Sequence, residues 1–239
     1  MCIRDRYRGV DVDPNLVMIV PGGKVTMFFA IKMFGEPGTE IIYPNPGFPI
    51  YESVINYTGA TPIPMPLHED KGYGFDADEV LSLINRNTRL LIINLPSNPT
   101  GGTVPRTEVE KLVQGLAEHP HVCVLSDEIY SRIIYDGREH VSLLEFEQIR
   151  DRLILLDGWS KTYAMTGWRL GYGHGPGVGR GQTAPHRPGR HDRGLPHPRG
   201  AVRRLQEVGQ RPRVGQVWVA RVSGVKDNQP AHGQNADND

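Results

Sequence analysis

Residues 90–102 read LLIINLPSNPTGG, an apolar run that ends in a loop of turn-forming residues. Residues 122–130 repeat this arrangement as VCVLSDEIY, and residues 153–162 repeat it as LILLDGWSKT. An apolar run without polar alternation is typical of a strand buried on both faces, as in a parallel sheet between two layers of helices. These stretches predict strands at 90–95, 122–125 and 153–156, each followed by polar residues.

Helical patterns separate the predicted strands. One apolar face repeats at helical spacing and consists of Val109, Leu112, Val113, Leu116 and Ala117. Thr107 and Glu110 predict a capping box at the start of this helix. Asp76 and Glu79 predict the start of a second helix, whose inward residues are Val80, Leu83 and Ile84.

Further elements precede and follow this central part. Short apolar runs predict strands at 17–20 and 40–43, and residues 169–173 also read as a strand. A helix with Val25, Phe28, Phe29 and Met33 is expected after the first strand. The alternation of strands and helices predicts a three-layer, doubly wound α/β fold with a mostly parallel sheet, which places ligands at the carboxyl ends of the strands.

Composition narrows the class of protein. The 239 residues suffice for one large domain or two small ones, and 38% of them are hydrophobic. No apolar run approaches the ~20 residues of a membrane helix, so we expect no membrane partner. The chain has two cysteines, Cys2 and Cys123, which are too few to stabilise a protein of this size through disulfide bonds. Together with a start that does not resemble a secretion signal, this predicts a cytoplasmic protein.

The chain changes character near residue 174. Residues 174–239 contain 11 Arg plus Lys against 5 Asp plus Glu, and they include 11 Gly and 7 Pro but only two Leu. The net charge is therefore +6 in this segment and −6 in residues 1–173. Since so few large apolar side chains cannot offset the entropy of ordering, we expect a disordered or non-native tail over 174–239.

The abrupt break suggests an origin for the tail. We interpret residues 174–239 as the product of a shifted reading frame, and residues 1–7 as a junction scar, because neither segment has periodicity or caps. Residues 8–173 then form the folded domain. An arginine-rich arm for nucleic acid is the rival interpretation, but one aromatic residue, Trp218, and little clustering argue against a nucleic-acid partner.

The first candidate site follows the first predicted strand. Pro21, Gly22, Gly23 and Lys24 stand directly before a helix. Paired glycines let backbone N–H groups approach an anion closely, and the start of a helix adds its positive dipole end. A turn of this kind can hold a phosphate, although a turn that only joins two elements is the more common finding.

Three more candidates follow the later strands. Asn98 lies in a rigid loop that is equally well explained as a turn of turn-forming residues. Asp127 ends a buried run, where a carboxylate is costly to ionise without a cation or donors, although an N-cap is the alternative. Lys161 is either a surface charge or, if buried, an amine nucleophile. Cys123 is interpreted as a small core residue, and no metal site is predicted.

Five segments in order resemble the class I and II aminotransferases, the aspartate aminotransferase-like enzymes of fold type I. They are PGGK at 21–24, PNPGFPIYE at 44–52, NLPSNPTGG at 94–102, SDEIY at 126–130 and SKTYAMTGWRLGYG at 160–173. The resemblance covers residues 8–173 and implies the large domain of an enzyme that uses pyridoxal 5'-phosphate.

The resemblance implies a role for each matching residue. Lys161, next to Ser160 in the cofactor site, would form a Schiff base with the cofactor aldehyde, and Asp127 would pair with the pyridine nitrogen. Tyr130 and Asn98 would bind the phenolic oxygen, and Phe48 would stack on the ring. The phosphate would be held by Arg169 and by the backbone at Gly23 and Lys24. Gly158 stands where many relatives have a hydroxyl residue.

The implied function is the transfer of an amino group between an amino acid and a 2-oxo acid, an activity of the EC 2.6.1 type, in a protein whose intact form is a homodimer. Because the tail replaces the segment that carries the family's substrate-binding arginine, we expect this chain to be weakly active or inactive. A carbon–sulfur lyase or related fold-type I enzyme, and a non-catalytic fragment, remain alternatives. The amino-acid specificity does not follow from the sequence.

Overall fold

The computed structural model describes residues 7–176. The predicted scar, except Tyr7, and the predicted tail, except residues 174–176, lie outside the described residues. Tyr7 packs on the domain, because its hydroxyl donates a hydrogen bond of 2.6 Å to the carbonyl of Ser131. The last strand reaches His174, one residue beyond the boundary predicted at 173.

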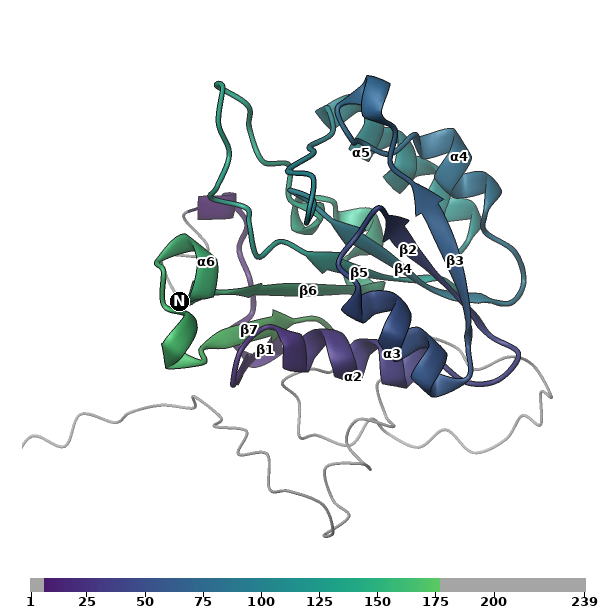
Figure 1. Cartoon of the computed structure of the whole chain (residues 1–239), viewed down its shortest axis with the longest axis horizontal. Helices are drawn as coiled ribbons and strands as arrows, with labels where there is room; N and C mark the ends of the chain where they lie inside the picture. Colours follow the sequence, from purple (N-terminus) through teal and green to yellow (C-terminus); the bar gives the residue numbers. More distant parts are fainter. Residues whose placement is uncertain (1–6, 177–239) are drawn as a thin grey trace, which may run out of the picture.

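A seven-stranded sheet forms the centre of the molecule, in the order β1-β7-β6-β5-β4-β2-β3 (Figure 1). The strands are β1 Val17–Val20, β2 Glu40–Asn45, β3 Thr61–Pro66, β4 Thr88–Asn94, β5 Cys123–Asp127, β6 Leu153–Gly158 and β7 Gly171–His174. Strands β2 to β6 pair in parallel, whereas β7 runs antiparallel to both β6 and β1. The mostly parallel sheet predicted from the sequence is confirmed.

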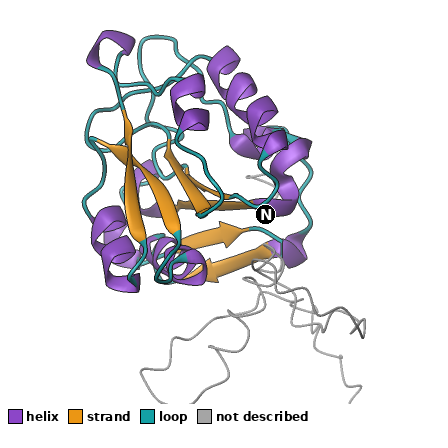
Figure 2. Cartoon of the chain, turned by 90° about the vertical axis from the view of Figure 1, so that its right-hand side faces the viewer, coloured by secondary structure: helices purple, strands orange, loops and turns teal. Residues whose placement is uncertain are grey.

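Helices cover both faces of this sheet (Figures 1 and 2). The α-helices are α2 Lys24–Phe34, α3 Ile50–Thr58, α4 Ala77–Ser82, α5 Arg106–Gly115 and α6 Trp159–Thr162. Six 3-10 helices join them, namely η1 Pro14–Leu16, η2 Glu69–Lys71, η3 Leu116–Glu118, η4 Leu143–Glu145, η5 Glu147–Arg152 and η6 Thr166–Trp168. Because α4 and α5 lie on one face and α2 and α3 on the other, the fold is doubly wound.

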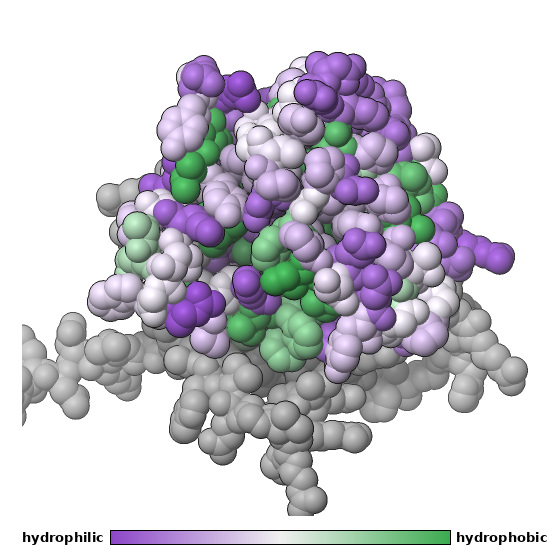
Figure 3. All heavy atoms as spheres, in the orientation of Figure 1, coloured by the Kyte–Doolittle hydropathy of each residue, from purple (hydrophilic) through white to green (hydrophobic). Residues whose placement is uncertain are grey.

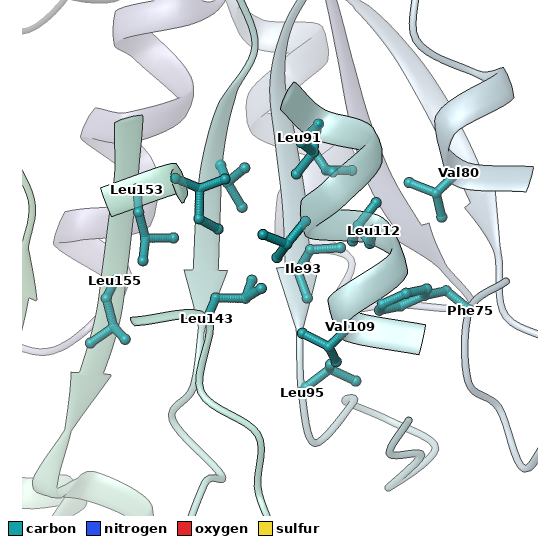
Figure 4. Packing of buried hydrophobic residues seen from close by; sticks show 14 of the residues in the cluster. Phe75, Val80, Leu91, Ile93, Leu95, Val109, Leu112, Leu143, Leu153 and Leu155 are labelled. Atoms are coloured by element: carbon teal, nitrogen blue, oxygen red, sulfur yellow. The ribbon is translucent and has the colours of Figure 1, made fainter. Parts of the chain in front are cut away.

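Strand β4 shows why residues 90–93 form an unbroken apolar run. Leu91 and Ile93 belong to the hydrophobic cluster under α4 and α5, and Leu90 and Ile92 belong to the cluster under α2 and α3. All four side chains are 0–1% exposed. Figure 4 shows Leu91 and Ile93 beside Leu112 of α5. Successive residues of a strand point to opposite faces, so burial on both sides requires an unbroken apolar run.

Two helix predictions differ from the structure. Helix α5 begins at Arg106 after Pro105, so Thr107 lies inside the first turn and the predicted capping box is absent. Helix α2 is placed correctly, but it packs through Met27, Ala30 and Ile31, while Phe28 is 36% exposed. This helix is apolar around most of its circumference, so periodicity alone does not indicate which side faces the sheet.

Strand β3 was not predicted. Its sequence, TPIPMP, contains Pro62, Pro64 and Pro66, and each proline removes a backbone donor. The strand lies at the edge of the sheet and pairs with β2 alone, where an edge strand tolerates proline.

The surface is polar over α4 and α5, and hydrophobic side chains gather nearer α2 and α3 on the face shown in Figure 3. Phe28 of α2 and Tyr57 of α3 have exposed rings, with centroids 6.5 Å apart. Among residues 7–176, no helix combines the length and the apolar character needed to cross a membrane.

Substitution of Leu112 tests the packing of α5 on the sheet. Leu112 is fully buried, so Leu112→Ala is expected to lower the free energy of unfolding by about 2–5 kcal/mol, because it leaves a cavity. Gln114→Ala on the exposed side of the same helix is the control, with an expected change within about 0.5 kcal/mol. Urea denaturation followed by circular dichroism measures both, and equal effects would contradict this packing.

Candidate functional site

The candidate site lies where β4, β5 and β6 end. Asp127 is the last residue of β5 and pairs in register with Asn94 of β4 and Leu156 of β6. The strands are parallel, so the loops that follow them leave the sheet at the same edge. Asn98, Tyr130 and Lys161 lie in these loops or just beyond them, as the sequence predicts.

Asp127 is a buried carboxyl group with two donors. It is 6% exposed. The hydroxyl of Tyr51 donates a hydrogen bond of 2.7 Å to Oδ2, and the backbone N–H of Ile129 donates one of 3.2 Å to Oδ1. Burial raises the pKa of Asp127 to about 6 even though both donors favour the charged form. A cation placed beside this carboxyl group would therefore be bound strongly.

Lys161 lies close to Tyr130. It belongs to α6, a four-residue helix that begins directly after β6, and its side chain is exposed rather than buried. The ammonium Nζ lies 5.4 Å from the centroid of the Tyr130 ring, and Tyr130 itself follows β5. Ser160, the preceding residue of α6, is half-buried. The structure thus brings two of the three predicted catalytic residues together, beside the strand that carries the third.

Glycines and one arginine form a cradle at the start of α2. A Cβ atom on Gly22 would collide with the guanidinium of Arg169, and one on Gly171 would lie 2.5 Å from the backbone nitrogen of Gly23. Only glycine permits such close approach of the backbone segments. Helix α2 has 11 residues and begins at Lys24, so its positive dipole end lies at this cradle, beside the backbone N–H groups of Gly23 and Lys24. The cradle therefore combines backbone donors with a guanidinium, the donors that bind phosphate.

A chain of side-chain contacts joins the cradle to Asp127. The ammonium of Lys24 lies 5.4 Å from the centroid of the Phe48 ring. Phe48 in turn contacts Tyr51 edge to face, with centroids 5.7 Å apart. Tyr51 then donates its hydrogen bond to Asp127. The three residues therefore line a continuous path between the two ends of the candidate site.

The Asn98 loop is tied to Asp127 by Asn94. The side-chain oxygen of Asn94 accepts a hydrogen bond of 2.9 Å from the backbone N–H of Asn98. Its Nδ2 donates one of 3.0 Å to the backbone carbonyl of Asp127. Asn94 thus fixes the loop relative to the strand that carries the carboxyl group.

Gly158 stands at a point where β6 and β7 approach closely. A Cβ atom there would lie 3.1 Å from the carbonyl oxygen of Leu170 and 3.1 Å from Cα of Gly171. These contacts are tighter than nine in ten contacts of real Cβ atoms, so a larger residue would need its neighbours to shift. The close approach of the backbone therefore suits glycine at this position.

Tyr51 and Asn94 were not among the predicted site residues. Tyr51 lies in the first turn of α3, three residues after Phe48, so this short separation could have indicated that the two side chains are neighbours. Asn94 is a polar residue at the end of an apolar run, the same signal that identified Asp127. A buried cluster of Arg8, Glu128 and Asp157 was also missed, because Arg8 lies far away in the sequence and belongs to no motif.

Glu128 is the opposite of its neighbour Asp127. It is 1% exposed, and burial alone would raise its pKa. The charges of Arg8 and His140 and the hydrogen bonds from His140 and Ser142 instead lower the pKa of Glu128 to about 2. The two adjacent buried acids therefore differ in how their charge is compensated. Arg8 and His140 pair with the carboxylate of Glu128, whereas no such cation contacts Asp127 among the described residues.

Comparison with known proteins places these features in a family. The model of the class I and II aminotransferases matches residues 2–178. Aspartate aminotransferase of Pyrococcus abyssi is 33% identical over 168 residues, which are 70% of this chain and 43% of the relative. Arginine–pyruvate transaminase of Pseudomonas aeruginosa is 36% identical over 177 residues, 73% of this chain and 44% of that protein.

Solved structures agree with the sequence matches. The aspartate aminotransferase of Rhizobium meliloti superposes with a TM-score of 0.69 and 31% identity, over 72% of this chain and 43% of that chain. The N-succinyldiaminopimelate aminotransferase of Mycobacterium tuberculosis gives 0.69 and 32%, over 73% and 46%. The chain therefore spans less than half the length of these relatives.

The contrast between the two acids predicts opposite effects of neutralising them. The pKa of Asp127, about 6 in the fold, exceeds the ~3.9 of a free aspartate, so its ionisation costs stability as the pH rises from about 4 to 6. Asp127→Asn is expected to raise the free energy of unfolding at pH 7 by an amount on the order of 2 kcal/mol and to change it little at pH 4.

Glu128→Gln is the matched control with the opposite sign. The pKa of Glu128 is lowered to about 2, so its contribution to stability is present above about pH 4.5 and is lost as the pH falls toward 2. The glutamine variant should be less stable at pH 7 than the unsubstituted chain. Urea denaturation at pH 4 and pH 7 measures both variants, and destabilisation by both at pH 7 would contradict the assignment.

Proposed function

This chain belongs to the class I and II aminotransferase family, and on that premise we propose that the protein moves an amino group between an amino acid and a 2-oxo acid with pyridoxal 5'-phosphate as its cofactor. Enzymes of the family generally depend on this cofactor. The observation that carries the proposal is the gathering, at one edge of the sheet, of a buried carboxyl group, an amine and an anion cradle.

The residues present fit three groups of pyridoxal phosphate, namely its phosphate, its ring nitrogen and its aldehyde. Its phosphate needs donors, which the cradle of Gly22, Gly23 and Gly171 supplies together with the guanidinium of Arg169. Its ring nitrogen, when protonated, needs an anion, which Asp127 supplies. Its aldehyde needs an amine, which Lys161 supplies. The chemistry of this set of donors therefore supports the proposed cofactor.

Asp127 serves the ring nitrogen because of its burial. Its pKa is raised to about 6, so the carboxylate is poorly stabilised by the protein alone. A protonated nitrogen beside it would supply the missing positive charge and lower the pKa of Asp127. The same carboxylate would in turn keep the nitrogen protonated. Tyr51 holds the carboxyl group in place from the other side through its hydrogen bond.

Lys161 is proposed to attach the cofactor and later to carry a proton. When bound, pyridoxal phosphate withdraws electrons from the α-carbon of an amino acid, which makes the proton there removable. The amine of Lys161, once free, accepts that proton and returns it as general base and acid. Tyr130, beside this amine, and Asn98 are proposed to donate to the phenolic oxygen, and Phe48 to stack on the ring.

Phosphate binding at the cradle would set the position of the cofactor. Backbone N–H groups at Gly23 and Lys24 and the guanidinium of Arg169 are fixed to separate elements, so an anion held by all of them has one orientation. Fixed orientation relative to Lys161 supplies part of the rate enhancement, because the reacting groups no longer need to find each other.

Substrate, assembly and location are proposals for the whole protein, since the chain spans 43% of the aspartate aminotransferase of Pyrococcus abyssi. The relatives are named for aspartate and for arginine with pyruvate, so amino acids and 2-oxo acids are the proposed substrates without a choice among them. A homodimer is proposed, for which the exposed rings of Phe28 and Tyr57 offer apolar surface. The buried free thiol of Cys123 suits the reducing cytoplasm.

Trapping of the cofactor tests the proposed amine. The purified chain is incubated with pyridoxal phosphate, reduced with borohydride and digested, and mass spectrometry locates the added group. The label is expected on Lys161 and is expected to disappear in Lys161→Ala. Lys32→Ala, which removes another exposed lysine, should keep it. A label spread over many lysines, or one retained in Lys161→Ala, would contradict the proposal.

Product analysis then tests the reaction. Incubation with an amino acid and a 2-oxo acid should yield the exchanged pair slowly, in keeping with the weak activity expected from the sequence, and this reaction should be lost in Lys161→Ala. Release of thiol or ammonia from the same amino acid would instead indicate a carbon–sulfur lyase or a related enzyme.

A further inference from the structure

Arg8 lies buried behind the candidate site and contacts two acids. Its side chain is 2% exposed. The Nε atom donates a hydrogen bond of 2.9 Å to Glu128, and Nη2 donates one of 2.8 Å to Asp157. The Nη1 atom lies 3.4 Å from the hydroxyl of Tyr172, which itself donates to Asp157 at 2.8 Å. One guanidinium therefore joins carboxylates from two parts of the chain.

These two acids flank the ends of neighbouring strands. Glu128 directly follows Asp127, and its backbone N–H donates a hydrogen bond of 2.9 Å to the carbonyl of Leu156 on β6. Asp157 lies on β6 and accepts a hydrogen bond of 2.6 Å from the backbone N–H of Gly158. The chain reaches Lys161 three residues after Gly158. Arg8 thus fastens the end of the strand that carries Asp127 to the end of the strand that leads to Lys161.

The electrostatic balance of this region also depends on Arg8. Asp127, Glu128 and Asp157 place three buried carboxyl groups at two adjoining strand ends. His140 contacts Oε2 of Glu128 at 2.9 Å, the same oxygen to which Arg8 donates. Without the guanidinium, the buried charges of Glu128 and Asp157 would repel each other, which would push the two strand ends apart.

The segment before β1 holds Arg8 in place. The guanidinium of Arg132 lies 3.8 Å from the centroid of the Tyr7 ring, and the hydroxyl of Tyr7 bonds to Ser131. Val10 and Val12, further along, are buried in the core. Anchors on both sides of Arg8 fix its backbone, so the guanidinium can act as a rigid fork between the two acids.

We propose that Arg8 is a positioning residue for the cofactor site, which sets the separation of Asp127 and Lys161. The proposal rests on the proposed function. Arg8, which precedes the first strand, would affect the binding of pyridoxal phosphate through its contacts with Glu128 and Asp157.

The test compares two equally buried arginines. Arg8 and Arg152 are each 8% exposed, but Arg152 donates to the backbone carbonyls of Leu116 and His119 after α5, away from the site. The dissociation constant of pyridoxal phosphate is measured on the folded full chain by absorbance titration. Arg8→Met is expected to weaken binding by roughly tenfold or more, the loss typical when the support behind a binding group is removed.

Further variants separate positioning from a merely structural role. Arg152→Met should lower the melting temperature but leave the affinity of the folded chain unchanged. Adding Asp157→Asn to Arg8→Met should recover part of the affinity, because it removes one carboxylate left without its cation. If Arg8→Met does not fold, Arg8→Lys is compared with Arg152→Lys, and only Arg8→Lys should lose affinity, since an ammonium lacks the fork that spans both acids.

The outcomes distinguish this inference from the proposed function. An unsubstituted chain that binds no pyridoxal phosphate would overturn the proposed function and this inference with it. If the unsubstituted chain binds pyridoxal phosphate but the Arg8 variants lose no more affinity than the Arg152 variants, only the role of Arg8 is overturned.

Discussion

Burial of β4 and β5 on both faces is the constraint from which the site follows. A strand covered by helices on both sides has no solvated face on which to place a polar side chain, so the middle of each of these strands is apolar, at residues 90–93 and 123–125. The polar residues come where the strand leaves the two helix layers, as Asn94 and Asp127 do. Parallel pairing then brings these ends to one edge. The same burial that stabilises the sheet therefore concentrates the chemistry.

Asp127 and Glu128 show how the fold treats charge at that edge. Glu128 receives a guanidinium, an imidazole and hydroxyl donors, and it is stabilised as an anion. Asp127 receives one tyrosine hydroxyl and one backbone donor, and its pKa is raised. Stability alone would favour an apolar residue at position 127. A costly buried carboxyl group beside a fully compensated one is the pattern expected where a ligand supplies the missing charge.

The sequence alone predicted most of the fold and the outline of the site, because both depend on local patterns. Apolar runs identified β4, β5 and β6 with ends within about two residues, and the residues after them identified Asp127 and Lys161. It did not predict β3, whose prolines oppose a strand and whose edge position tolerates them. Nor did it predict Tyr51 or Arg8 as neighbours of the acids, because those contacts join residues 76 and 120 positions apart.

The reversed direction of β7 has a consequence for the order of assembly. This strand inserts between β1 and β6, and it brings Gly171 against the Gly22–Gly23 turn and Arg169 beside it. The residues of the anion cradle therefore follow β1, the first strand of the sheet to be synthesised, and flank the start of β7, the last. The other five strands are synthesised between these two. A nascent chain can therefore bury the hydrophobic residues around β4 and β5 before its phosphate-binding cradle has formed. Binding of a phosphate at the cradle would therefore indicate that β7 has already paired with β1.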